Sequence, residues 1–146
     1  MKLFLHISLM LIVLALFCSV VFADIPAAAI RTQDKADICT TKTSGIRHIE
    51  IKQKYAAMKA LGMKLSDSGK VEWDHIISLT DGGSNDIVNM QIQSYFGKCN
   101  AHDKDRLEVK LHSLICHDKV DVNDAQELLY NHWQEGYKQY INARGC

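Results

Sequence analysis

The sequence lacks a net charge, because its 17 lysine and arginine residues equal its 17 aspartate and glutamate residues in number. A protein that binds many phosphate groups usually carries an excess of basic side chains, so this balance counts mildly against one. Internal repeats and low-complexity tracts are also absent. The composition alone therefore gives no electrostatic argument for nucleic-acid binding, and the length fits one small domain.

The first 23 residues have the pattern of an export signal. Lys2 is followed by an apolar run from Leu3 to Phe22, and the run ends in Val21-Phe22-Ala23, with small residues at positions −3 and −1. An uncleaved membrane anchor is the alternative, since the run is nearly long enough to span a bilayer. We predict a signal peptide over residues 1–23, cleavage after Ala23, and a secreted or periplasmic protein.

No two cysteines have the CxxC spacing of a zinc knuckle or a redox site. Cys18 lies in the predicted signal peptide, which leaves an even number of cysteines for an oxidising compartment. These are Cys39, Cys99, Cys116 and Cys146. They predict structural disulfides, and four cysteines allow three pairings between which the spacing does not choose.

The exported part divides into a short linker and one domain. Residues 24–31 are small and hold the only proline, which predicts a flexible linker before a single domain over residues 32–146. Residues 33–47 are polar without helical periodicity and are expected to form an ordered loop. Apolar spacing predicts a helix over residues 48–63 that ends at Gly62.

Two strands and two further helices are expected after this first helix. Residues 71–79 and 87–93 predict strands, and the Gly-rich segment between them predicts an antiparallel hairpin. A helix should start near Ala101, with an apolar stripe at helical spacing. The stripe consists of Leu107, Leu111, Leu114 and Ile115. A final helix should begin within residues 121–124. The predicted class is α+β.

The first strand carries an acid and an imidazole side by side, Asp74 and His75, in an otherwise apolar run. Neighbours on a strand point to opposite faces, so the two side chains cannot share one core. A strand–loop–strand–helix unit can bring Asp74 against the start of the helix, where Asp74 and His102 can share a divalent cation. His75 would then accept a proton from water, since a reference pKa of about 6.5 suits a base near neutrality.

The segment DHIISLTDGGSNDIVNM resembles the D-H-x-(I/P)-x-L-x-x-G-G-x-x-x-x-x-N-(L/M) signature of the HNH endonucleases, which have the ββα-metal fold. The resemblance implies a ββα core over about residues 71–117, with Asp74 as a metal ligand and His75 as the general base. It implies that Asn89 braces the loop and orients the base. NAHDKDRLE, from residue 100 to 108, resembles the start of the family's helix, where His102 is the expected last ligand.

The mature chain is more closely similar to small secreted bacterial HNH-like proteins over most of residues 32–140. That similarity includes DICTTKTSGIR before the site and the K-D-x-(L/V)-E segment after it. It implies the disulfides Cys39–Cys116 and Cys99–Cys146. The chain lacks the CxxC zinc pair of many HNH proteins, and Asn100 and Asp103 compete with His102 for the role of last ligand.

The expected function is metal-dependent cleavage of phosphodiester bonds, with DNA rather than RNA as the substrate. One divalent ion is expected, Mg²⁺ or Mn²⁺ ahead of Zn²⁺, held by Asp74 and His102. Lys104 and Arg106 are a solvated helix face in the simplest interpretation and phosphate contacts in the functional one. The alternative function is a catalytically silent, exported binding domain on an HNH scaffold. A purely structural protein would leave Asp74 and His75 unexplained.

Overall fold

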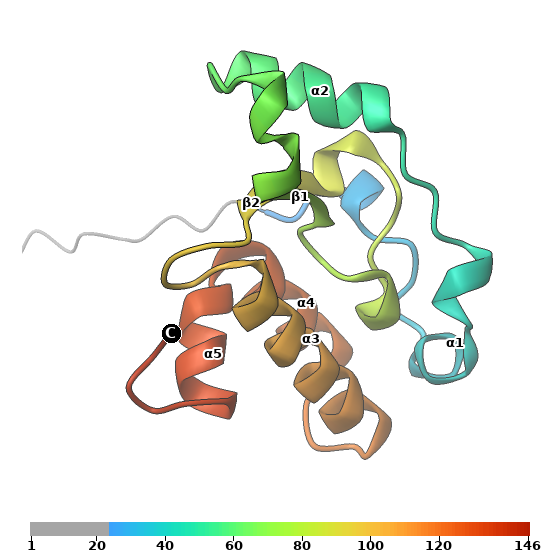
Figure 1. The fold of residues 1–146 in the computed structure, drawn as a ribbon. Helices are drawn as coiled ribbons and strands as arrows, with labels where there is room; N and C mark the ends of the chain where they lie inside the picture. The colour runs from blue at the N-terminus through green and yellow to red at the C-terminus, as the bar shows by residue number, and fades with distance from the viewer. Residues whose placement is uncertain (1–23) are drawn as a thin grey trace, which may run out of the picture.

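A two-stranded antiparallel sheet and five α-helices make up the part of the chain that the computed structural model describes, residues 24–146 (Figure 1). The predicted signal peptide of residues 1–23 lies outside this described part. The mixture of helix and strand agrees with the predicted α+β class. Within residues 24–146, none of the helices has both the length and the apolar character that a membrane span requires.

The hairpin consists of β1 (Val71–His75) and β2 (Met90–Ser94). Val71 pairs with Ser94 and His75 with Met90. β1 begins at the predicted residue but ends four residues early, and β2 begins three residues later than predicted. The chain leaves β1 after His75 and forms a short 3-10 helix, η4 (Leu79–Asp81), whose first turn is capped by Ser78. A second one, η5 (Ile87–Asn89), leads into β2.

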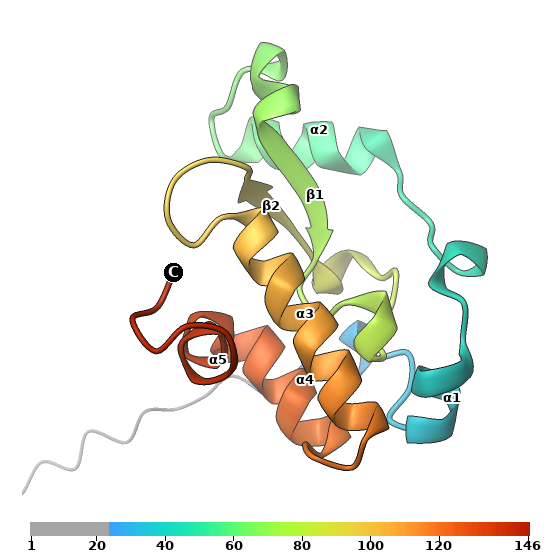
Figure 2. The ribbon, with the colours of Figure 1, turned by 60° about the horizontal axis from the view of Figure 1, so that its bottom comes forward.

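The helix α3 (Ala101–Cys116) begins where the sequence predicts it. Asn100 caps it, because the Asn100 side chain accepts a hydrogen bond from the Asp103 backbone N–H while the Asp103 side chain accepts one in return. Figure 2 shows α3 running away from the hairpin with α5 on one side and α1 on the other. The predicted apolar stripe is buried at Leu107, Leu111 and Ile115.

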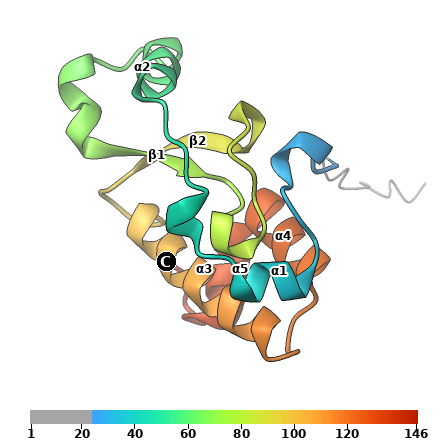
Figure 3. The same ribbon diagram turned by 90° about the vertical axis from the view of Figure 1, so that its right-hand side faces the viewer.

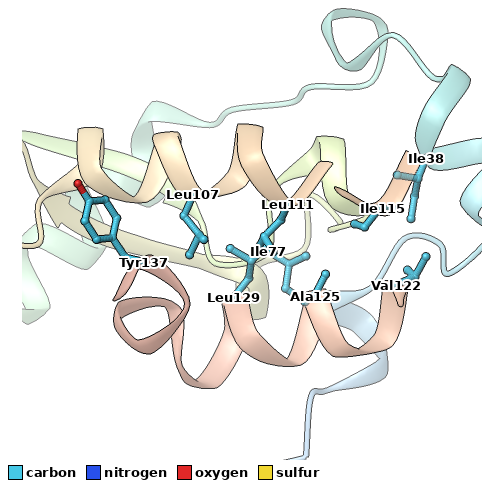
Figure 4. Packing of buried hydrophobic residues seen from close by; sticks show 9 residues of the cluster. All are labelled: Ile38, Ile77, Leu107, Leu111, Ile115, Val122, Ala125, Leu129 and Tyr137. Atoms are coloured by element: carbon cyan, nitrogen blue, oxygen red, sulfur yellow. The ribbon is translucent and has the colours of Figure 1, made fainter. Parts of the chain in front are cut away.

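Two helices, not the single predicted one, follow α3: α4 (Val122–Asn131) and α5 (Trp133–Tyr140). His132 leaves helical geometry at φ −145° and ψ 30°, so the chain bends between them. The bend lets α5 pack on α3. Gly136 lies so close to Leu128 that a Cβ there would approach the Leu128 Cδ2 to 2.7 Å. Figure 4 shows the core between α3 and α4, with Ile77 inserted from the segment after β1.

Residues 24–31 form a fixed segment, not the flexible linker that the small residues predict. Ala29 is fully buried, and the backbone N–H groups of Arg31 and Thr32 both donate to the Gly82 carbonyl oxygen, at 2.8 and 3.1 Å. Ile30 forms an isolated β-bridge with Gly83. Small residues at this position allow close packing against the loop after β1, which the linker interpretation missed.

The predicted loop over residues 33–47 contains the helix α1 (Lys35–Thr40), whose N-terminus is capped by the Asp34 side chain. Only Ile38 of α1 is buried, so its apolar pattern is too weak to signal a helix. The helix α2 (Ile51–Ala60) then lies across the hairpin on the side away from α3, α4 and α5 (Figure 3). The 3-10 helix η3 (Leu65–Lys70) connects α2 to β1.

Both predicted disulfides are confirmed. Cys39 pairs with Cys116 at a Cα–Cα distance of 5.7 Å, which ties α1 to the end of α3. Cys99 pairs with Cys146 at 4.9 Å, which ties the C-terminal tail to the segment before α3. Crosslinks that close loops this long restrict the unfolded chain and stabilise the fold by about 4 kcal/mol each in the chain-entropy model.

Candidate functional site

His75 ends β1, and its side chain is buried, only 2 % exposed. Its Nε2 atom lies 3.1 Å from the Asn85 Oδ1 atom. The orientation of the Asn85 amide follows from its other bonds. Its Nδ2 donates to the Ile46 carbonyl oxygen at 2.7 Å, and its Oδ1 accepts from the His48 backbone N–H at 3.0 Å. The Asn85 oxygen therefore faces the ring, and His75 Nε2 is the donor.

This arrangement selects one neutral tautomer of His75, with the proton on Nε2 and the free lone pair on Nδ1. Burial lowers the pKa of His75, which keeps the ring neutral near physiological pH. A neutral imidazole with a fixed Nε2–H can accept a proton at Nδ1. Nothing in the spacing around Asn85 marked it as the partner of His75, because its other partners lie nearly forty residues earlier in the chain.

Asn89 holds the loop after β1 and is fully buried. Its Oδ1 accepts from the Ile77 backbone N–H at 2.9 Å, and its Nδ2 donates to the carbonyl oxygens of Ile77 at 3.0 Å and Ser84 at 2.8 Å. The side chain thus joins both ends of the loop. Gly83 is required there, since a Cβ would lie 1.9 Å from the Ile77 carbonyl oxygen. The resemblance implies that Asn89 orients the base, but the side chain that bonds to the His75 ring is that of Asn85.

Asp74 points to the opposite face of β1 from His75, toward α3, where its partner is Lys104. The Lys104 ammonium donates to Asp74 Oδ2 at 2.8 Å, to the His75 carbonyl oxygen at 2.7 Å and to the Glu108 carboxylate. Lys104 is fully buried, so all three donors of its ammonium are satisfied within the protein. Desolvation lowers the pKa of Lys104, but the Glu108 and Asp74 carboxylates outweigh it and raise that pKa.

Negative charge exceeds positive charge around this ammonium. Burial raises the pKa of Glu108 to about 8, against the opposing effect of Lys104. Burial also raises the pKa of Glu72 and of Asp105, and the Asp74 charge adds to both shifts. One ammonium therefore compensates only part of the surrounding carboxylate charge.

The predicted partner of Asp74, His102, lies elsewhere on α3. Its side chain is 68 % exposed, its ring stacks on Tyr95 at a centroid distance of 5.3 Å, and its Nδ1 lies 3.8 Å from Asp105 Oδ2. The other two candidates, Asn100 and Asp103, form the cap of the helix.

A divalent ion shared by Asp74 and His102 does not fit this arrangement, because an ammonium group already occupies the Asp74 carboxylate. Among residues 24–146, no three His, Cys, Asp or Glu side chains lie close enough together to hold a metal ion. The metal roles of Asp74 and His102 stay predictions from the resemblance.

The two predicted phosphate contacts both have partners inside the protein. Lys104 is buried as described. The Arg106 guanidinium donates to the Tyr137 hydroxyl at 2.7 Å and lies over the Tyr137 ring, 5.5 Å from its centroid. Arg106 thus contributes to the contact between α3 and α5.

A second buried carboxylate, Asp81, faces α3 two turns beyond Lys104. The Ser78 hydroxyl donates to Asp81 Oδ2 at 2.5 Å, whereas Asp81 Oδ1 has no hydrogen-bond partner among the described residues. The His112 Nδ1 atom lies 3.8 Å from Asp81 Oδ1 and donates to the Thr80 carbonyl oxygen at 3.0 Å. Burial raises the pKa of Asp81 to about 7.

Comparison of the chain with protein-family models, with curated proteins and with solved structures found no match. The likeness to the HNH endonucleases therefore rests on the motif and on the residues described above.

Proposed function

We propose that the protein is an exported, secreted or periplasmic, endonuclease that hydrolyses phosphodiester bonds with His75 as general base. The observation that carries the proposal is the hydrogen bond from His75 Nε2 to Asn85 Oδ1, which leaves Nδ1 as the basic atom. The motif around Asp74, His75 and Asn89 supplies the reaction class through its resemblance to the HNH endonucleases. DNA is the expected substrate.

In the proposed reaction, a water molecule attacks the phosphorus atom while His75 Nδ1 takes one of its protons. A new P–O bond forms as the bond from phosphorus to the leaving sugar oxygen breaks, and the leaving oxygen takes a proton from solvent. His75 returns its proton to solvent afterwards. The Lys104 ammonium holds Asp74 and the His75 carbonyl group in place, which fixes the end of β1. No step passes through a metal ion.

A silent binding domain on the same scaffold is the second candidate function, and two observations favour it. His75 is only 2 % exposed, so little of its ring is open to water or to a substrate. Lys104 is fully buried and its donors are satisfied internally, which leaves it no donor for a phosphate.

The test is cleavage of plasmid DNA and of RNA by purified protein in which both disulfides have formed. We expect His75→Ala to lower the rate by about 10² to 10⁴-fold, the usual cost of removing a general base. The matched control is His112→Ala, which changes a partly buried histidine outside the site and should cleave like the wild type. Thermal unfolding of both variants checks that they are folded.

Equal cleavage by His75→Ala and the wild type would show that His75 is not the base. No cleavage of either nucleic acid by the wild type would favour the silent binding domain.

A further inference from the structure

Asn85 bonds to a second chain segment, residues 46–48, in addition to bonding to His75. Its amide bonds to the Ile46 carbonyl oxygen at 2.7 Å and to the His48 backbone N–H at 3.0 Å, and these two groups flank Arg47. The same amide oxygen accepts from His75 Nε2 at 3.1 Å. The backbone of Arg47 is therefore fixed on both sides by the residue that orients His75.

The Arg47 side chain is exposed and forms no hydrogen bond or ion pair with any residue in the range 24–146 that the structure describes. Burial is the larger influence on the pKa of His75 and of Glu72, lowering the first and raising the second. The positive charge of Arg47 lowers the pKa of both groups. The Lys104 ammonium, by contrast, has all three of its donors engaged within the protein, and one Arg106 nitrogen bonds to Tyr137. Of these three cations, Arg47 is the one whose backbone is held by the residue that bonds to His75.

We propose that Arg47 binds the phosphate group of the substrate beside His75. A guanidinium presents two parallel N–H groups to two phosphate oxygens, so one arginine both attracts and orients a phosphodiester. Its fixed backbone limits the positions of the bound phosphate, and its positive charge opposes protonation of the neighbouring imidazole. The inference rests on the proposed function, since it assigns the contact that places the phosphorus atom near His75 Nδ1.

The first test measures kcat and KM for a small phosphodiester, bis(p-nitrophenyl) phosphate. Arg47→Ala should lower kcat/KM by about 10- to 100-fold, as expected for loss of charge-assisted hydrogen bonds, and mainly through KM. Arg47→Lys should recover part of the loss, because lysine keeps the charge but not the paired donors. Arg144→Ala is the matched control, since it removes an exposed arginine from the C-terminal tail. Equal constants for Arg47→Ala and Arg144→Ala would overturn the assignment while leaving the nuclease function standing.

A second readout does not depend on catalysis. Dimethyl phosphate is titrated into ¹⁵N-labelled protein, and the Asn85 side-chain and His48 backbone amide resonances are followed, with sodium chloride at matched ionic strength as the reference. The assignment predicts a saturable shift in the wild type and in Arg144→Ala that is lost in Arg47→Ala. A wild-type response no larger than that to chloride, or an unchanged response in Arg47→Ala, would overturn it. If the wild type binds dimethyl phosphate through Arg47 but cleaves nothing, the proposed function fails and the phosphate site remains.

Discussion

Asp74 and Asp81 lie seven residues apart in the chain, and both carboxylates face α3. They differ in the groups that contact the carboxylate oxygens. Asp74 meets the buried ammonium of Lys104 at 2.8 Å. Asp81 is more deeply buried than Asp74, but its carboxylate has only the Ser78 hydroxyl and, at 3.8 Å, the partly exposed ring of His112. Burial raises the pKa of Asp81 to about 7. The two sites therefore differ in the cation beside the carboxylate, since within residues 24–146 a buried ammonium contacts Asp74 and none contacts Asp81.

Removing the cation from the compensated pair should have the larger effect on stability. Lys104→Met leaves Asp74 and Glu108 facing each other without an ammonium between them. Breaking a buried ion pair by deleting one partner typically costs about 3 to 5 kcal/mol in the free energy of unfolding. Protonation of Glu108, whose pKa burial raises to about 8, relieves part of this cost. Urea unfolding at neutral pH measures the change.

The matched control is Lys110→Met, which removes an exposed lysine from the same helix and should change the free energy of unfolding very little. If Lys104→Met does not fold, the triple variant Lys104→Met, Asp74→Asn, Glu108→Gln removes all three charges together and should recover folding. A free energy of unfolding for Lys104→Met equal to that of Lys110→Met would show that the ammonium does not compensate Asp74.

Removing the charge from the uncompensated site should stabilise the protein. The pKa of Asp81 rises from 3.8 to about 7 on folding, so the native state binds a proton that the unfolded state releases. The stability that this proton provides is complete below pH 4 and is lost as pH rises through about 7. Asp81→Asn should therefore be more stable than the wild type at pH 8, by about 2 to 4 kcal/mol, and similar to it at pH 4.

Urea unfolding of Asp81→Asn at several pH values checks this expectation. Mass spectrometry must confirm that the new Asn-Gly step at Gly82 has not deamidated, because deamidation restores the carboxylate. The same profile for Asp74→Asn gives the contrast, since Asp74 loses a paired charge and should lose stability at neutral pH. If Asp81→Asn gains the same stability at pH 4 as at pH 8, the gain does not come from removing a buried charge. The contrast between Asp81 and Asp74 would then be wrong.

The hairpin and α3 could be predicted from the sequence because their signals are local. Gly82 and Gly83 mark the loop, and Leu107 and Leu111 define a buried stripe at helical spacing. Lys104 is expected from the sequence on a solvated helix face or at a phosphate, although it lies one turn before Leu107 on that same stripe. A charged residue within the apolar stripe of a helix is expected to be buried with an oppositely charged partner. This position could have identified Lys104 as a buried, paired residue.

The partners of the candidate site could not be predicted in the same way, because they come together only in the folded chain. Asn85 meets Ile46 across 39 residues, and no spacing rule connects them. The break at His132 depends on the packing of α5 against α3, which overrides the continuous helical pattern. The disulfide pairing came from the resemblance, because four cysteines alone leave three pairings open.

The central claim is that the Asp74 carboxylate binds the Lys104 ammonium and not a divalent ion during cleavage. Cleavage of plasmid DNA in excess EDTA tests this claim most directly. Protein is purified through EDTA, its metal content is measured, and its rate is compared with and without added Mg²⁺ or Mn²⁺. We expect metal-free protein to cleave at the same rate in EDTA as with either ion, and His75→Ala to be inactive in both. Cleavage that disappears in EDTA and returns with Mg²⁺ or Mn²⁺ would contradict this and restore Asp74 as a metal ligand.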